Sequence, residues 1–327
     1  MMEAEGEFAA AALRFSVALA QRDFQAELRR LFRSHGWDRT LPAMRLRVLK
    51  AHKDRCTFEV SLDTDHGWQS LIGKVHDLDR SDLVGAMQSI MDAGFGPTAE
   101  FSIPTPLTYV PSLHVILEEH VPGTPAKEIF LNSSLDEQLA TARRCGAWLA
   151  RYHAGAPRQG RLAEPSELGV QIGYWAQQIR SSGGPLGIKA ALLLRKLEAA
   201  MPAPGSFEAR AGHGSYMPEH VLLSGRRTVT IDFDEYGVAD PARDLAWFIV
   251  SLERLGLKSR GSVRAHDRSI RVFLEAYRDS GPQDATKHLA FYKAAECLHR
   301  AHRDLRKRFP PIPEWSDMML DEGLSAL

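Results

Sequence analysis

The spacing of apolar residues changes at residues 118–123, and this change constrains the fold more than any other feature of the sequence. Before it, three short runs at 45–50, 56–62 and 68–76 are rich in β-forming residues and are separated by polar turns. After it, apolar residues recur at the spacing of long helices. A Pro-Gly pair within the segment interrupts regular structure. The pattern predicts a small β-rich part followed by a larger helical part.

The N-terminal part is predicted to combine an antiparallel meander with flanking helices. Residues 7–34 show helical spacing of apolar side chains, and the short turns between the three runs favour antiparallel neighbours. A second helix is predicted after Ser81, a suitable N-cap, and it ends near Gly94. A further strand is predicted over 113–118.

The C-terminal part is predicted to be mainly helical with one hairpin. Ser134 and Glu137 form a capping box, and Asp240-Pro241 suits another helix start. Two apolar runs, 221–223 and 228–233, flank a polar turn and predict the hairpin. Further helices are predicted over 166–180, 187–200, 266–279 and 284–307. The fold class is therefore α+β, with an N-terminal lobe over 1–118, a hinge at 119–124 and a helical lobe over 125–327.

Composition narrows the classes of partner. The chain has 41 basic and 41 acidic residues, so no global field attracts nucleic acid or an anionic membrane. Three scattered cysteines form no disulfide framework, and no apolar stretch approaches the roughly 20 residues of a membrane span. The acidic N-terminus differs from a signal peptide. We expect a cytoplasmic protein with neither nucleic acid nor membrane as a partner.

Two charged residues lie in runs that are otherwise apolar. Lys74 falls in the third strand-like run, where a lysine is costly unless its ammonium finds a partner or reaches solvent. Asp232 closes the second hairpin run, where its carboxylate can enter a cleft. The simpler interpretations are an outward-facing lysine at a sheet edge and a turn aspartate that accepts from nearby amides. Phosphoryl transfer needs a phosphate-binding cation and a metal-binding carboxylate, which makes both residues candidates.

The stretch 213–246 carries the most specific pattern. It runs His213-Gly-Ser-Tyr-Met-Pro-Glu-His220, then Ile-Asp-Phe-Asp, then Asp-Pro-Ala-Arg-Asp244-Leu-Ala. In order and spacing it resembles the aminoglycoside-phosphotransferase and choline-kinase-like family. The resemblance implies a two-lobed protein-kinase-like fold, with a small antiparallel N-terminal sheet. It further implies ATP or another nucleoside triphosphate, Mg²⁺ or Mn²⁺, and a small substrate with a hydroxyl group.

The resemblance also assigns roles to individual residues. Lys74 corresponds to the phosphate-contacting lysine, and Asp232 to the principal metal-binding aspartate. Glu119, His120 and Val121 fall where adenine meets the hinge backbone. His213 corresponds to the histidine that braces the loop, and Asp244 to an aspartate that braces it from the next helix. The resemblance also implies that acceptor contacts come from about 166–210.

Several positions depart from the family pattern. Ser215 stands where the family has its catalytic aspartate, and His220 stands where it has a metal-binding asparagine. No glutamate occurs between residues 75 and 99, so the helix glutamate that orients the strand lysine is missing, with Gln88 near its spacing. The turn at 51–55 has no glycine for close approach to phosphates. Serine carries no charge at neutral pH, and histidine prefers softer metals than Mg²⁺.

Two hypotheses remain open at this point. The first is a phosphotransferase whose candidate catalytic residues are His213, Ser215 and Asp232, with Asp232 and His220 at the metal and Glu219 or Asp234 replacing the lost base. The second is a catalytically inactive nucleotide-binding pseudokinase or protein-interaction module. A metal site at His299 and His302 is weighed against a polar helix face, and the polar face is favoured because no third ligand is evident.

Overall fold

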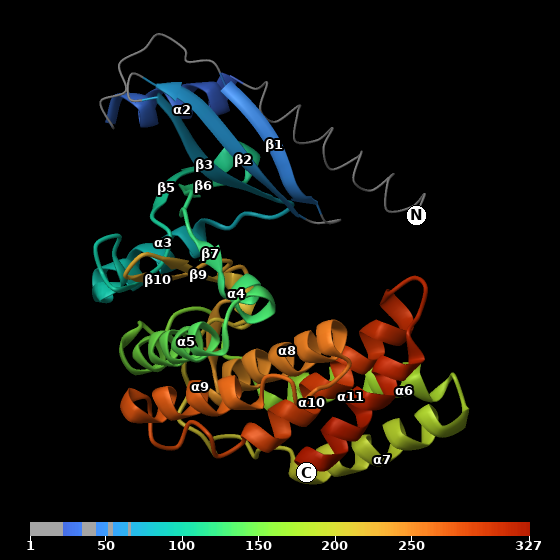
Figure 1. The fold of residues 1–327 in the computed structure, drawn as a ribbon. Coiled ribbons are helices and arrows are strands. Elements are labelled where there is room, and N and C mark those ends of the chain that lie inside the picture. Colours follow the sequence, from blue (N-terminus) through green and yellow to red (C-terminus); the bar gives the residue numbers. More distant parts are fainter. Residues whose placement is uncertain (1–21, 35–43, 52–54, 65–66) are drawn as a thin grey trace. The chain divides into compact units, whose positions relative to one another are not determined.

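The computed structural model describes residues 22–34, 44–51, 55–64 and 67–327. Its contacts divide the chain into two compact units, Met1–Pro122 and Gly123–Leu327 (Figure 1). Of the helix predicted over 7–34, the part before residue 22 lies outside the described residues, as does most of the turn predicted at 51–55. No described helix is both long and apolar enough to cross a membrane. The fold class is α+β, as predicted.

A five-stranded antiparallel sheet forms the N-terminal unit. Its order is β1 (Met44–Ala51), β2 (Arg55–Thr64), β3 (Gly67–His76), β6 (Val115–Glu119) and β5 (Pro106–Val110). The first three strands pair as the predicted meander. Every second residue of β2 is buried, and Phe58 and Val60 pack against Phe24 and Leu28 of α2 (Arg22–Ser34). The alternation of apolar and polar residues in β2 therefore predicts correctly which face of the strand is buried.

Shorter elements complete this unit: α3 (Ser81–Ile90), the turn η1 (Met91–Phe95), β4 (Phe101–Ser102) and the turn η2 (Pro111–Leu113). The prediction that Ser81 caps α3 was wrong. Ser81 is already helical, and its amide donates to Asp79 Oδ1 at 2.9 Å. Gly94 ends the helical region as predicted, with a φ of 99° that favours glycine.

The C-terminal unit is mainly helical. Its helices are α4 (Ala126–Asn132), α5 (Leu135–Gly155), α6 (Pro165–Arg180), α7 (Gly184–Ala200), α8 (Ala242–Arg260), α9 (Asp267–Ser280), α10 (Leu289–His302) and α11 (Pro313–Ala326), with η4 (Arg303–Lys307) after α10. The capping box of Ser134 and Glu137 is present at the start of α5. Sequence analysis missed α4 and α11. The latter buries Met319 and Leu320 in the same core as α7 and α10.

Short strands surround the candidate loop. They are β7 (Thr124–Pro125), β8 (Arg210–Gly212), β9 (Val221–Ser224), β10 (Arg227–Thr230) and β11 (Gly237–Ala239), with the turn η3 (Pro218–His220). β9 and β10 form the predicted hairpin, and β8 pairs with β11. The hairpin strand ends at Thr230 rather than at 233, so Asp232 lies beyond the strand and not within it. The β8–β11 pair joins the two ends of the segment between Gly212 and Gly237, and the hairpin lies within that segment.

Candidate functional site

A buried carboxylate at the start of α8 holds the loop that begins at His213. Asp244 Oδ2 accepts the His213 amide at 2.7 Å, and Oδ1 accepts the Gly214 amide at 2.9 Å. His153 of α5 places Nε2 3.2 Å from Oδ2. Burial works to raise the pKa of Asp244, but its hydrogen bonds and close contacts with His153 and His213 lower the pKa overall. The carboxylate therefore stays ionised and holds two successive amides.

The ring of His153 is itself oriented from a second helix. Because a carboxylate only accepts, Nε2 carries the proton, and Nδ1 accepts from the hydroxyl of Tyr277 at 2.8 Å. Tyr277 lies on α9 and has no motif around it, so sequence analysis gave no signal for it. The family pattern did single out Asp244 as a brace.

The ring of His213 ties the loop to the segment after the hairpin. Its Nδ1 accepts the Ser215 amide at 3.4 Å, so Nε2 donates to the carbonyl of Ile231 at 3.0 Å. Complete burial lowers the pKa of His213 to about 4, partly offset by the charge of Asp244. The ring is therefore neutral near pH 7, as both hydrogen bonds require.

Gly214 is the point where the loop packs most tightly. Its φ is 81°, and a Cβ placed there would lie 2.0 Å from the carbonyl oxygen of Glu235. Any other residue would have to adopt an unfavourable backbone conformation and displace a neighbouring chain segment. The glycine of the His-Gly-Ser sequence is therefore required by packing.

His220 links Ser215 to Asp232. Its Nδ1 lies 2.9 Å from the carbonyl oxygen of Ser215, and its Nε2 lies 3.3 Å from Asp232 Oδ2. Since a carbonyl only accepts, Nδ1 is a donor. Two arrangements fit Nε2. In a protonated ring it donates a second N–H to the carboxylate, and in a neutral ring its lone pair could share a cation with Asp232. The structure thus brings Ser215, His220 and Asp232 together, as the candidate set requires.

Asp232 has an unusual backbone conformation. Its φ of 68° lies in the left-handed region, which aspartate tolerates better than most residues but which remains uncommon. Such conformations persist where the surrounding structure imposes them, and they concentrate at functional sites. Glu219 is exposed on η3 beside this group, whereas Ser215 is buried.

The described residues contain no cluster of three His, Cys, Asp or Glu side chains able to hold a metal ion. His220 and Asp232 alone would supply two ligands. Mg²⁺ is commonly held by one or two protein ligands together with substrate phosphates and water, so two donors suit a metal that arrives with a nucleotide. His299 and His302 serve other contacts: His299 stacks on Trp175 at 4.5 Å and pairs with Glu296.

In the N-terminal unit, Lys74 is buried and paired. Its Nζ lies 3.3 Å from Glu118 Oε1, and both side chains are less than a tenth exposed. Lys74 of β3 is in register with Ile116 of β6, so Glu118 is its diagonal neighbour on the same face of the sheet. The expectation that Lys74 lacks an orienting ion pair was wrong. The carboxylate comes from the neighbouring strand, whereas Gln88 of α3 donates to Asp92 of η1 at 3.0 Å.

Glu119 is the last residue of the same strand, and His120 and Val121 follow it. The Glu119 amide donates to the carbonyl of Thr105 at 2.9 Å, and its carboxylate accepts from the Thr105 amide at 3.2 Å. Val121 is buried and His120 is half-buried. The Glu119 amide is therefore already engaged within the unit.

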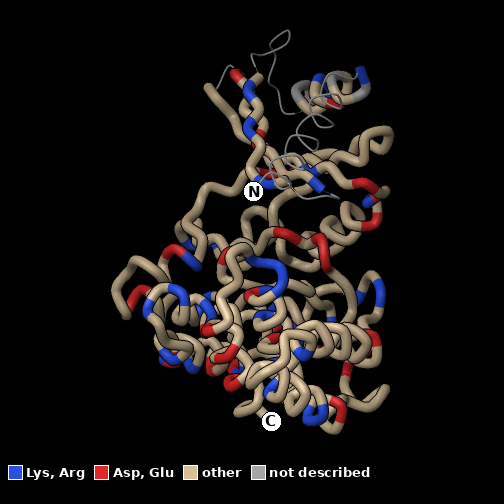
Figure 2. Tube along the Cα trace, turned by 90° about the vertical axis from the view of Figure 1, so that its right-hand side faces the viewer, with Lys and Arg blue, Asp and Glu red and all other residues tan. Residues whose placement is uncertain are grey.

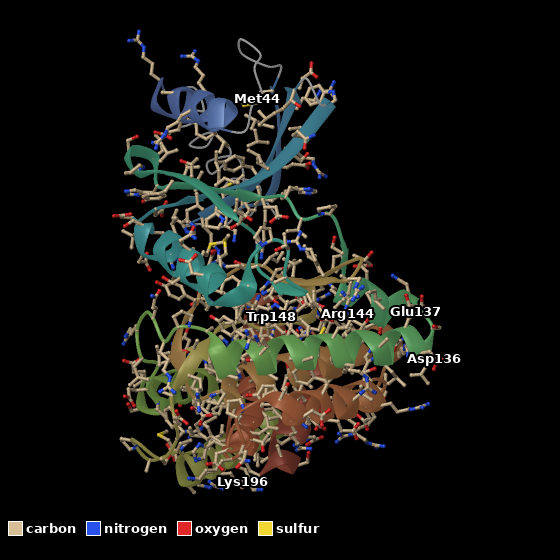
Figure 3. All side chains as sticks on the ribbon, turned by 90° about the vertical axis from the view of Figure 1, so that its left-hand side faces the viewer. Met44, Asp136, Glu137, Arg144, Trp148 and Lys196 are labelled. Atoms are coloured by element: carbon tan, nitrogen blue, oxygen red, sulfur yellow. The ribbon has the colours of Figure 1, made fainter. Side chains whose placement is uncertain are left out.

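An aromatic stack supports the loop from α5. Trp148 and Arg144 lie four residues apart on one side of this helix (Figure 3). Trp148 stacks on Tyr216 at 5.6 Å, and the Tyr216 hydroxyl donates to the carbonyl of Cys145 at 2.8 Å. Arg144 donates to the carbonyl of Arg227 at 2.6 Å in the hairpin. The residue after Ser215 is therefore a core residue, which fixes the loop against the helix.

Comparison with known families decides the classification. Residues 93–288 match the model of the phosphotransferase enzyme family. The chain belongs to this family. The match spans more than half of the chain and includes the whole loop from His213 to Asp244. Comparison with curated proteins gives no match.

Several solved structures share the fold. A choline/ethanolamine kinase family protein from Mesorhizobium loti aligns with a TM-score of 0.57 at 17% identity, over 100% of this chain and 95% of that one. Glucosamine kinase in complex with glucosamine, ADP and inorganic phosphate aligns with a TM-score of 0.60 at 17% identity, over 87% of this chain and 82% of that one. A thermostable mutant of aminoglycoside phosphotransferase APH(4)-Ia aligns with a TM-score of 0.59 at 14% identity, over 90% of this chain and 97% of that one. The predicted family and kinase-like fold are confirmed.

Proposed function

We propose that this member of the phosphotransferase family binds ATP or another nucleoside triphosphate with a divalent metal ion. It transfers the terminal phosphoryl group to a hydroxyl of a small molecule. The observation that supports this most is the loop held by Asp244, which keeps Ser215, His220 and Asp232 together on a rigid base. The related glucosamine kinase structure holds ADP, in keeping with nucleotide use. In this proposal residues 1–118 and 125–327 are the two lobes, and 119–124 is the hinge.

Lys74 is the proposed phosphate contact. A buried ammonium needs a carboxylate to stay charged and to hold one position, and Glu118 lies 3.3 Å away. Glu118 thus takes the part that a helix glutamate takes in the family pattern. With the Glu119 amide engaged by Thr105, adenine contacts from the hinge would come from the backbone of His120 and Val121.

Asp232 and His220 are the proposed metal ligands. One carboxylate and one imidazole suit Mn²⁺ better than Mg²⁺, because imidazole is a softer donor than the amide oxygen of asparagine. The bound metal ion neutralises charge on the phosphates. Asp244 and His213 bind nothing themselves in this scheme, and their part is to fix the loop.

Ser215 leaves the site without the usual catalytic carboxylate. Most of the acceleration in phosphoryl transfer comes from positioning and charge stabilisation, so loss of the base lowers the rate without removing the reaction. The proposed replacement is Glu219, an exposed carboxylate on η3 that directly precedes His220 in the chain.

The alternative is a pseudokinase that binds nucleotide without transferring phosphate, or serves as a protein-interaction module. Two observations favour it. Ser215 carries no carboxylate, and His220 Nε2 already lies 3.3 Å from Asp232. A protonated His220 would satisfy Asp232 by itself and would exclude a cation.

The first test is nucleotide binding by the full chain. Thermal unfolding is measured with ATP, GTP and ADP, each with and without Mg²⁺ or Mn²⁺. A ligand specific for the native state at a hundredfold excess over its Kd adds roughly 2.7 kcal/mol of stability. We expect a metal-dependent shift that is lost in Lys74→Met and kept in Lys50→Met, since Lys50 is an exposed lysine on β1 of the same sheet. No shift with any nucleotide would overturn the proposal.

A further inference from the structure

A cavity of about 260 Å³ beside the candidate loop is lined mainly by cations. Pro218 and Glu219 of η3 form its side toward the loop. The positive charges come from four elements, α4, α8, α10 and η4, and they are Lys127, Arg254, Lys258, Arg300 and Arg303. Elsewhere on the helices of this unit, basic and acidic residues are interspersed (Figure 2). The gathering of five cations from four elements therefore sets this cavity apart.

Three of these five cations have no carboxylate partner among the described residues, so the cavity keeps an excess of positive charge. Arg254 pairs with Asp304, and Arg300 Nε lies 2.5 Å from Glu296 Oε1. Lys127, Lys258 and Arg303 form no ion pair with any carboxylate in the described part of the chain. Glu219 is the one acidic residue in the wall. Even when Asp304 and Glu296 are counted, the cations outnumber the carboxylates by five to three.

The central arginine has unused hydrogen-bond donors. Arg254 is 9% exposed, and its Nε and Nη1 have no hydrogen-bond partner among the described residues. Buried donors without acceptors are rare in native proteins and often mark the place of an ion or a water molecule. Burial and the charge of Arg254 lower the pKa of Lys258 to about 8, although the lysine as a whole is exposed. An anion in the cavity would accept hydrogen bonds from Arg254 and would stabilise the charged form of Lys258.

An aromatic ring keeps the cations in place. Trp315 of α11 has the Arg254 guanidinium 5.6 Å and the Lys258 ammonium 5.7 Å from its ring centroid. Both distances allow cation–π attraction, which holds like charges near each other without neutralising them. The wall is thus arranged to keep its positive charge.

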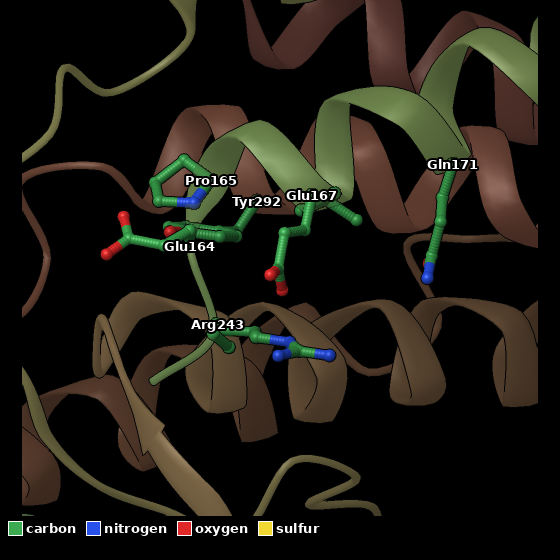
Figure 4. A pocket seen from close by; sticks show the side chains of 8 residues that line it. Glu164, Pro165, Glu167, Gln171, Arg243 and Tyr292 are labelled. Atoms are coloured by element: carbon green, nitrogen blue, oxygen red, sulfur yellow. The ribbon is translucent and has the colours of Figure 1, made fainter. Parts of the chain in front are cut away.

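Other cavities of the C-terminal unit suit an acceptor less well. The pocket in Figure 4 lies between α6 and α8, with Glu167 and Arg243 pointing into it from opposite sides, and has a volume of only about 60 Å³. It is close to the segment from which the family resemblance implied acceptor contacts. Two cavities of about 410 and 310 Å³ are lined from residues 205–210, 240–241 and 282–287. None of these three includes a residue between His213 and Asp232.

We infer that the acceptor of the proposed reaction is a small anion, an alcohol that also bears a phosphate or carboxylate group, and that this cation-lined cavity binds its charged end. The inference rests on the proposed function. The acceptor hydroxyl oxygen forms a bond to the terminal phosphorus of the nucleotide as the bond to the nucleoside diphosphate breaks. The diphosphate leaves with the bonding electron pair. The hydroxyl proton passes to Glu219 and then to solvent.

The experiment measures anion binding to the full chain by calorimetric titration, in the absence of nucleotide. The probes are glycerol 3-phosphate, 3-phosphoglycerate and inorganic phosphate, with uncharged glycerol as a control. The pocket variant is Lys258→Glu/Arg303→Glu. The matched control is Arg271→Glu/Arg278→Glu on α9, which makes the same change in net charge at exposed positions. We expect at least a tenfold weaker Kd in the pocket variant, an unchanged Kd in the control variant, and no binding of glycerol.

Several outcomes would overturn the inference. They are equal affinity in the two variants, no binding of any anion by the wild type, and binding to phosphatidylserine vesicles alone that the pocket variant loses. The last would assign the surface to a membrane instead. Lys258→Gln/Arg303→Gln repeats the test if the charge reversal impairs folding. Because no nucleotide is present, failure here leaves the proposed phosphotransfer standing. Conversely, if the protein binds anions but no nucleotide, the cavity remains an anion-binding site and the proposed phosphotransfer is rejected.

Discussion

Two pairs of polar side chains stand where the family pattern has different partners, and they differ in kind. Lys74 and Glu118 lie on neighbouring strands of a regular sheet, and both are buried. His220 and Asp232 lie on an irregular loop, with side chains 11% and 23% exposed. In the first pair the carboxylate has moved to another element and keeps its chemistry. In the second, an imidazole replaces an amide. The relocated carboxylate therefore keeps the ion pair of Lys74, whereas the imidazole changes the kind of donor that stands beside Asp232.

The largest effect is expected from breaking the buried pair. Glu118→Leu leaves the Lys74 ammonium without this carboxylate in the sheet, and loss of one partner of a buried pair costs about 3–5 kcal/mol. Lys74→Met/Glu118→Leu removes both charges and should recover most of that stability while nucleotide affinity stays low. Chemical denaturation and nucleotide titration of the two variants separate the effects. Equal stability of Glu118→Leu and the wild type would show that the pair does not hold Lys74.

The loop that carries His220 and Asp232 should be tightly packed, as the sheet around Lys74 and Glu118 is. Gly214→Ala forces a left-handed alanine against the Glu235 carbonyl and should cost about 2–3 kcal/mol. Gly225→Ala in the hairpin turn is the control, because its φ is also positive, at 56°, but nothing lies within 4 Å of the added Cβ. It should cost about 1 kcal/mol. Similar losses in the two variants would mean that the loop is not tightly packed at Gly214.

The chemical difference in the loop predicts a change in metal preference. His220→Asn restores an amide oxygen beside Asp232 and should shift nucleotide binding from Mn²⁺ toward Mg²⁺ by about tenfold. Nucleotide Kd values measured with each metal give the ratio directly. His220→Ala should weaken binding with both metals. If the ratio is the same in the wild type and in both variants, His220 is not a metal ligand.

The smallest effect concerns a buried histidine outside both pairs. Burial lowers the pKa of His266 to about 4, so the native state favours the neutral ring. The stability that this confers is complete above the ordinary pKa near 6.5 and is lost as the pH falls toward 4. Between pH 6.5 and 5.5 its loss is on the order of 1 kcal/mol. His266→Gln should reduce this slope of unfolding free energy against pH, and an unchanged slope would place the acid sensitivity elsewhere.

Local signals in the sequence located much of the fold. The alternating residues of β2 and the capping box before α5 depend only on near neighbours in the chain, and both were predicted correctly. Interactions across the fold were not accessible in this way. Glu118 lies 44 residues after Lys74 and meets it only through the pairing of β3 with β6. The Tyr277 hydroxyl likewise reaches His153 from a helix 124 residues further along the chain.

The candidate site shows the same division. The motif placed His213, Ser215, His220, Asp232 and Asp244 in one stretch, and the structure joins them by hydrogen bonds and an ion pair. The roles of these residues, and of Lys74 and the hinge residues, stay predictions. The cation-lined cavity draws on α4, α8, α10 and η4, so no local pattern could have assembled it.

In the proposed reaction, phosphoryl transfer survives the loss of the catalytic aspartate. The most direct measurement is release of ADP from ATP with Mn²⁺ across a panel of hydroxyl compounds. We expect acceptor-dependent ADP release that falls about a hundredfold in Asp232→Asn and is unchanged in Asp279→Asn, where Asp279 is an exposed aspartate on α9. No release above buffer by the folded wild type, together with activity gained in Ser215→Asp/His220→Asn, would contradict it and identify the chain as an inactive nucleotide binder.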